Sequence, residues 1–209
     1  MVLPKQTVVD KILSGSPRNQ YRIMVVGNSK VDKDYSELID SADMVVRFSK
    51  VLEYDTGLVG SKTNVVVSRV GAVTVRFRNY FKQITTNKPW HDAEEYWFSG
   101  RPCDSDPAYI QTYLDKYTDF DARPMRYMVI SPLFNSKFGV SKNQERPTMT
   151  SGIVTLLYLL SINNLKDSTI QLVGFKDFYT RPDDDWHDVD MDKRLIQDLH
   201  NNKYIELIG

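Results

Sequence analysis

Short apolar runs rich in β-branched residues alternate with segments of helical spacing, and this alternation constrains the fold more than any other feature. The expected strands are residues 23–26, 44–48, 64–68, 95–98, 127–130, 170–173 and 204–207. Several of these runs are continuous rather than alternating, which is typical of strands covered on both faces. The expected helices are residues 35–41, 73–83, 107–117, 152–163 and 190–201. Strands that alternate with helices predict an α/β fold with a layered sheet.

Length and composition predict one soluble domain. At a rough 150 residues per domain, 209 residues make a single unit, which we place at residues 21–209 after an N-terminal extension of residues 1–20. The balance of 27 basic and 27 acidic residues argues against a generally basic nucleic-acid binder. The single cysteine, Cys103, excludes an intramolecular disulfide and fits a reducing compartment. No signal or membrane-spanning segment is evident, so we expect a cytoplasmic protein that acts at membranes only peripherally.

Ligands of open α/β sheets bind outside the carboxyl ends of the strands, and the first such end carries Gly27, Asn28 and Ser29. Glycine permits a sharp turn, while the amide and hydroxyl side chains add polar groups to backbone N–H groups that can hold a phosphate or a sugar. A single glycine is not the dinucleotide-binding fingerprint. A simple strand-to-helix turn explains these residues equally well.

A second candidate site lies where Thr150, Ser151 and Gly152 precede the apolar run IVTLLYLL. Thr150 or Ser151 is expected to cap a buried helix. Unpaired N–H groups, hydroxyls and the positive end of the helix dipole meet there, which is how proteins bind phosphate without a metal. Capping without a ligand uses the same atoms, so the spacing does not separate the two interpretations.

The third candidate is His187, which lies in an acidic segment that runs from Asp183 to Asp192. Neighbouring carboxylates would raise the pKa of the imidazole and orient its ring, as suits a general base. His187 and Asp192 would not share a helix face, so a pairing requires His187 to precede the helix. Most of the acids are expected to be solvated or to stabilise the helix start. A metal site at Asp183–Asp185 is disfavoured because that triplet follows Arg-Pro in a polar loop rather than a strand.

Taken in this order, the three segments resemble glycosyltransferase family 29, the sialyltransferase family, in its soluble bacterial or phage form. The large first motif of the family resembles Val25–Val67, which contains VVGNS, IDSADMVVRFSK and GLVGSKTNVVV. The second motif is similar to Pro147–Phe175, and the last, a histidine followed by an acid, to His187 with Asp192. The resemblance implies a Rossmann-like three-layer sandwich of the modified GT-A type, with about seven mostly parallel strands flanked by helices.

The same resemblance implies an inverting glycosyltransferase that moves sialic acid or a similar sugar from a CMP-activated donor to an acceptor hydroxyl. Such an enzyme would need no cofactor and no metal. His187 would be the general base and Asp192 its supporting acid. The donor-binding residues would be Gly27, Asn28, Ser29, Arg47, Ser49, Thr150, Ser151 and Gly152.

Three departures from the family pattern keep other interpretations open. Ser49 stands where the family has an asparagine that contacts the donor, the paired cysteines of animal members are missing, and the final acid is Asp192 rather than glutamate. A transferase of the same fold could use another CMP- or UDP-activated sugar, of Kdo or pentose type, with hydroxylated bases of phage DNA as a further acceptor. A non-catalytic nucleotide-binding module is the alternative from a different class.

The middle of the chain is ambiguous. The basic stretch Arg69–Lys88 could attract an anionic glycan or a nucleic-acid acceptor, or form an ordinary amphipathic helix with solvated charges. The aromatic residues of Trp90–Trp97 suit stacking on a sugar but are more typical of a core. The long polar connection Pro132–Met149 is either a lid or a disordered loop. The acceptor, the linkage and the oligomeric state do not follow from the sequence.

Overall fold

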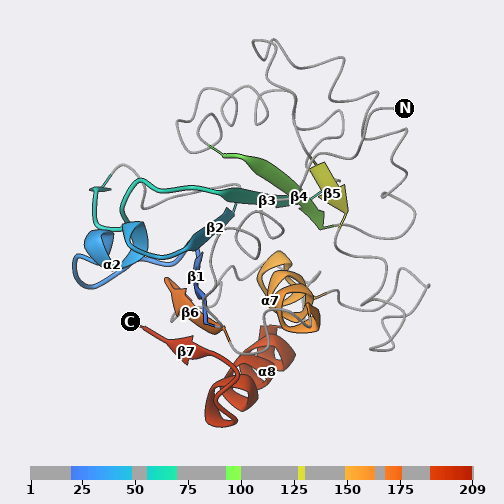
Figure 1. The fold of residues 1–209 in the computed structure, drawn as a ribbon. Coiled ribbons are helices and arrows are strands. Elements are labelled where there is room, and N and C mark those ends of the chain that lie inside the picture. Colours follow the sequence, from blue (N-terminus) through green and yellow to red (C-terminus); the bar gives the residue numbers. More distant parts are fainter. Residues whose placement is uncertain are drawn as a thin grey trace, which may run out of the picture.

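The computed structural model describes residues 20–48, 56–69, 93–99, 127–129, 149–162, 168–175 and 189–208, and in these ranges the chain forms one parallel sheet (Figure 1). The strands are β1 (Arg22–Val26), β2 (Met44–Phe48), β3 (Val65–Arg69), β4 (Glu95–Ser99), β5 (Tyr127–Val129), β6 (Thr169–Val173) and β7 (Glu206–Leu207). Their order is β5-β4-β3-β2-β1-β6-β7. The chain therefore builds outward from β1 in one direction and returns to its other side with β6. Such a reversal is where open α/β sheets bind ligands.

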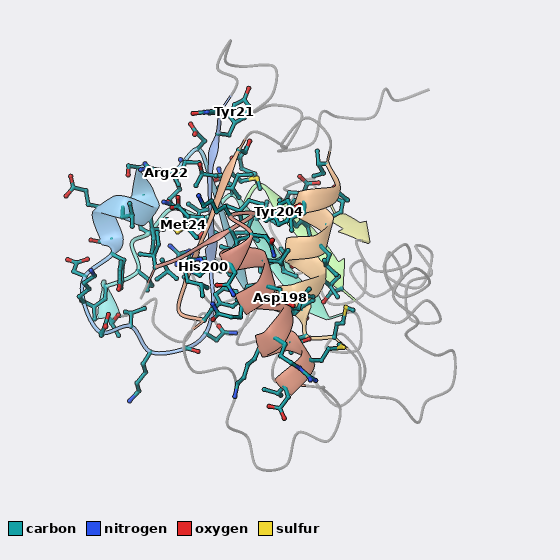
Figure 2. All side chains as sticks on the ribbon, turned by 90° about the horizontal axis from the view of Figure 1, so that it is seen from below. Tyr21, Arg22, Met24, Asp198, His200 and Tyr204 are labelled. Atoms are coloured by element: carbon teal, nitrogen blue, oxygen red, sulfur yellow. The ribbon has the colours of Figure 1, made fainter. Side chains whose placement is uncertain are left out.

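Helices cover both faces of this sheet. Helix α2 (Ser36–Asp40) lies on one face. Helices α7 (Ser151–Ser161) and α8 (Val189–Asn201) lie side by side on the other face, as both views show (Figures 1 and 2). Alternate residues of each strand face the two layers, because successive side chains of a strand point to opposite faces. The α7 face buries Ile23, Val25, Val46 and Trp97, among others, whereas the α2 face buries Met24, Val26, Val45 and Val173.

The α/β class and the parallel sheet flanked by helices are confirmed. Each segment expected to be a strand overlaps a strand, although β7 begins two residues later than expected, and three expected helices lie at α2, α7 and α8. The runs in the strand interiors are continuous because both faces are buried, as in Met44–Phe48, where every residue is buried. The expected helices at 73–83 and 107–117, residues 1–19 and the connection from Pro132 to residue 148 lie outside the described residues.

Helix α7 is apolar on almost every side because it is enclosed. Most of its side chains are buried, from Ile153 through Leu159, which is typical of a helix packed against a sheet and a second helix. No helix within the described ranges has the length and apolar composition needed to cross a bilayer.

Helix α8 ends in a Schellman motif that places a lysine in a strained conformation. The Tyr204 N–H donates to Leu199 O at 2.9 Å and the Lys203 N–H donates to His200 O at 2.9 Å. Lys203 adopts φ 62°, the left-handed conformation that glycine supplies most easily at this position. Figure 2 shows His200 and Tyr204 at this end of the helix.

We therefore expect Lys203→Gly to stabilise the protein. Relief of the left-handed conformation should raise the free energy of unfolding by about 1 kcal/mol, or the melting temperature by about 2–4 °C for a chain of this size. Lys203→Ala is the control, because it removes the charge and keeps the conformational cost. Equal stability of the two variants in urea unfolding would contradict the prediction.

Candidate functional site

The backbones of two strand ends meet closely where the sheet order reverses. Beyond β1, the Gly27 N–H donates to Val173 O at 2.7 Å and the Ser29 N–H donates to Gly174 O at 3.0 Å. A Cβ atom at position 27 would lie only 2.2 Å from the Gly174 carbonyl oxygen. Gly174 itself has φ +72°, which favours glycine. Two glycines thus allow the ends of β1 and β6 to approach.

Asn28 lies between the two bonded residues of this junction and carries a buried polar atom. Its Oδ1 is buried and has no hydrogen-bond partner among the described residues. Leaving such an acceptor unpaired costs about 1–3 kcal/mol, so the position favours a ligand that supplies a donor. The turn interpretation of Gly27–Ser29 and the ligand interpretation are therefore compatible.

The segment that follows Ser29 leads into α2 and is fixed to the loop at Leu58. The Tyr35 hydroxyl donates to Asp32 at 3.0 Å, and the Tyr35 N–H donates to Leu58 O at 2.8 Å. Burial of the phenol, and then the bond to Asp32, raise the pKa of Tyr35 above its ordinary value. The turn that carries Asn28 is thus anchored on its downstream side.

Among the described residues, the amino end of α7 leaves two backbone N–H groups without a hydrogen-bond partner. Thr150 is the N-cap, its hydroxyl accepts from the Ile153 N–H at 3.5 Å, and its carbonyl accepts from the Val154 N–H at 3.1 Å. The N–H groups of Ser151 and Gly152 form no hydrogen bond with any residue of the described ranges. Because the helix dipole places partial positive charge at the same end, this terminus suits an anion.

Phe175 connects the glycine turn with the helix terminus. Its ring lies 3.0 Å from the position that a Gly27 Cβ would occupy and 3.1 Å from that of a Gly152 Cβ. The Phe48 ring, at the end of β2, contacts it edge to face at 6.0 Å between centroids. Gly27 and Gly152, predicted separately from the sequence, thus border one aromatic ring.

Two further side chains hold the amino end of α7 in place. The carboxylate of Asp192, fully buried on α8, accepts from the Thr150 N–H at 3.0 Å. The hydroxyl of Ser99, the last residue of β4, lies 2.7 Å from the hydroxyl of Ser151. The sequence analysis missed Ser99, although the rule about the carboxyl ends of strands, applied to β4, would have indicated it.

Comparison of the whole structure with solved structures decides the kind of fold. A mammalian sialyltransferase in complex with Gal-beta-1-3GalNAc-ortho-nitrophenol matches with a TM-score of 0.56 and 16% identity, over 96% of this chain and 78% of that one. The apo alpha-2,3-sialyltransferase from Campylobacter jejuni matches with 0.57 and 16%, over 92% and 76%. The sialyltransferase CstII from the same bacterium, in complex with the substrate analogue CMP-3FNeuAc, matches with 0.57 and 17%, over 90% and 79%.

The fold is that of the sialyltransferases. No protein-family model matches the sequence, and no curated protein matches it either. The resemblance inferred from short motifs is thus supported by a structural likeness that covers most of the chain.

Within this sialyltransferase fold, the described bonds of Arg47 attach it to the Val59–Thr63 loop. The residue is fully buried. Its Nε donates to Lys62 O at 3.0 Å and to the Thr63 hydroxyl at 3.1 Å, and its Nη2 donates to Val59 O at 2.7 Å. By strand alternation its side chain lies on the α2 face, away from α7. These bonds fasten the Val59–Thr63 loop to β2, and the predicted contact of Arg47 with the donor stays a prediction.

The remaining predicted site residues cannot be placed. His187, Ser49 and Asp183–Asp185 lie outside the described residues. Helix α8 spans Val189–Asn201, and the predicted pairing of His187 with Asp192 stays a prediction. In the described part of the chain, no cluster of three or more His, Cys, Asp or Glu side chains could hold a metal ion.

Trp97 is fully buried and packs edge to face on Tyr158 at 5.0 Å between ring centroids, which confirms the core interpretation for this aromatic residue.

Proposed function

We propose that this chain is an inverting glycosyltransferase that uses a CMP-activated sugar, sialic acid or a close analogue, without a metal. The observation that carries the proposal is the open amino end of α7, which shares Phe175 with the Gly27 turn in a sialyltransferase fold. Structures with this fold hold CMP or a CMP-sugar analogue. We further propose that residues 21–209 form one catalytic domain of the Rossmann-like, modified GT-A type, and that it acts in the cytoplasm.

The donor phosphate is assigned to the amino end of α7. CMP leaves with one phosphate group, and the N–H groups of Ser151 and Gly152, with the helix dipole, would stabilise its departing charge. Asn28 Oδ1 would accept a hydrogen bond from the nucleotide or the sugar. Gly27 and Ser29 would shape the adjoining wall, and Thr150 would keep the helix terminus capped.

The proton and the bond changes follow from an inverting displacement. The acceptor oxygen attacks the anomeric carbon on the face opposite the phosphate, the bond from that carbon to the phosphate oxygen breaks, and CMP departs. We propose that His187 takes the proton of the attacking hydroxyl, as a general base does. Ser49 remains a proposed donor contact. The acceptor is a glycan or another hydroxyl compound, with a nucleic-acid base as the second possibility.

A nucleotide titration followed by a product assay tests this function. At 100 times its Kd, CMP should stabilise the protein by about 2.7 kcal/mol, or roughly 5–10 °C in melting temperature. UDP and NAD serve as matched controls and should produce much smaller shifts. Transfer or hydrolysis is then measured with CMP-sialic acid and with other CMP- and UDP-sugars.

The outcomes separate the alternatives. Turnover of CMP-sialic acid alone supports the sialic acid donor, whereas turnover of a Kdo-type or pentose donor favours the alternative suggested by Ser49. CMP binding without hydrolysis or transfer of any donor would favour a nucleotide-binding module. No stabilisation by CMP would overturn the proposed function.

A further inference from the structure

Ser99 ends β4 beside the proposed donor site and has no role in the function described so far. Its side chain is 3% exposed, and its Oγ lies 2.7 Å from Ser151 Oγ. β4 and α7 are far apart in the sequence, so this hydroxyl pair joins two elements that contribute separately to the site. The distance is typical of an O–H···O hydrogen bond.

The hydrogen bond between the two hydroxyls leaves one of their protons available for a ligand. Each serine hydroxyl has one proton, and the bond between them uses one of the two. If Ser99 donates to Ser151, the Ser151 proton is left to donate to a third group. An anion at the amino end of α7 would favour this direction, because its oxygens accept protons and do not donate them.

The backbone around Ser151 is already fixed on both sides. The Thr155 hydroxyl donates to Ser151 O at 2.7 Å, and the N–H of the preceding residue, Thr150, donates to Asp192 at 3.0 Å. The position of the Ser151 backbone is therefore fixed, and only the direction of the Ser151 O–H bond remains to be determined. Ser99 Oγ is the described group that bonds to it.

We propose that Ser99 is a positioning residue for the donor phosphate: its hydroxyl donates to Ser151 and so directs the Ser151 proton at a phosphate oxygen. The inference rests on the proposed function, since it assumes a phosphate at the amino end of α7. The inference predicts different effects on ligands with and without the phosphate, because a ligand that lacks the phosphate makes no hydrogen bond to the Ser151 hydroxyl.

The test compares CMP with cytidine, the same nucleoside without its phosphate. Calorimetric titrations use the full chain as wild type, Ser99→Ala, Ser151→Ala, the double variant and the control Ser161→Ala. Ser161 is also on α7, at its carboxyl end, where its hydroxyl bonds to Tyr158 O. We expect Ser99→Ala and Ser151→Ala each to weaken CMP binding by about 5–10-fold and to leave cytidine binding unchanged. The double variant should lose less than the product of the two single losses.

The possible results are distinct. Equal weakening of CMP and cytidine by Ser99→Ala, or no weakening of CMP, overturns the role of Ser99 while the proposed function stands. Failure of the wild type to bind CMP overturns both. If Ser99→Ala does not fold, Ser99→Cys keeps a side chain of the same shape, slightly larger and with only a weak donor. A loss of affinity for CMP alone then supports the proposal, and an unchanged affinity overturns it.

Discussion

Gly27→Ala should abolish CMP binding and destabilise the protein by about 3 kcal/mol or more. The added methyl carbon would lie 2.2 Å from the Gly174 carbonyl oxygen and 2.9 Å from its carbonyl carbon. Both atoms belong to the backbone, and the neighbouring Gly27 N–H is already bonded to Val173 O. Neither strand end can yield without breaking the contact between β1 and β6 that forms one side of the site.

Gly57→Ala is the matched control for this variant. Gly57 has φ +75°, yet a Cβ atom there would meet nothing within 4 Å. Its substitution carries only the conformational cost of about 1–2 kcal/mol and should leave CMP affinity unchanged. Urea unfolding and CMP titration of both variants measure the two effects. A Gly27→Ala protein as stable as Gly57→Ala, with unaltered CMP affinity, would refute the importance of this close approach.

His187→Ala should reduce sugar transfer by about 10²–10⁴-fold and leave CMP affinity nearly unchanged. The proposed base takes the proton of the acceptor hydroxyl, whereas the nucleotide is assigned to the Gly27 turn and to α7. The measurement is steady-state transfer at saturating donor, together with a CMP titration of the same protein.

His200→Ala supplies the control for the loss of a histidine. His200 lies in the last turn of α8, and its Nδ1 is 3.3 Å from Ile205 O, so its replacement should leave the transfer rate unchanged. Undiminished transfer by His187→Ala would remove His187 from the mechanism. A parallel loss in the His200 variant would indicate that α8 as a whole, rather than one base, controls the rate.

The sequence predicts the framework of this fold well because its signals are local. Continuous apolar runs such as Met44–Phe48 mark strands buried on both faces, and the Thr150 cap before an apolar segment marks the start of α7. Gly27 and Gly152 were predicted as separate sites. Their joint contact with Phe175 depends on the strand order, which no local pattern contains.

Two features that the sequence did not predict, the position of Ser99 and the loop contacts of Arg47, follow the same distinction. Ser99 and Ser151 are 52 positions apart in the sequence, so no local pattern around either serine predicts their contact. Arg47 was assigned to the donor because it lies near the end of β2 in a matching motif. Strand alternation places Arg47 on the α2 face. Its bonds to Val59 and Thr63 depend on a loop that folds back onto the sheet.

The bond between the Thr150 N–H and Asp192 has a consequence for the order in which the protein matures. Asp192 lies in the last helix, and β6, which pairs with β1, also comes late in the chain. The turn at Gly27 is synthesised well before its partner strand β6 and before Asp192, which bonds to the amino end of α7. Contacts this distant raise the relative contact order and slow folding. A nascent chain that lacks α8 therefore cannot form the bond that holds the amino end of α7.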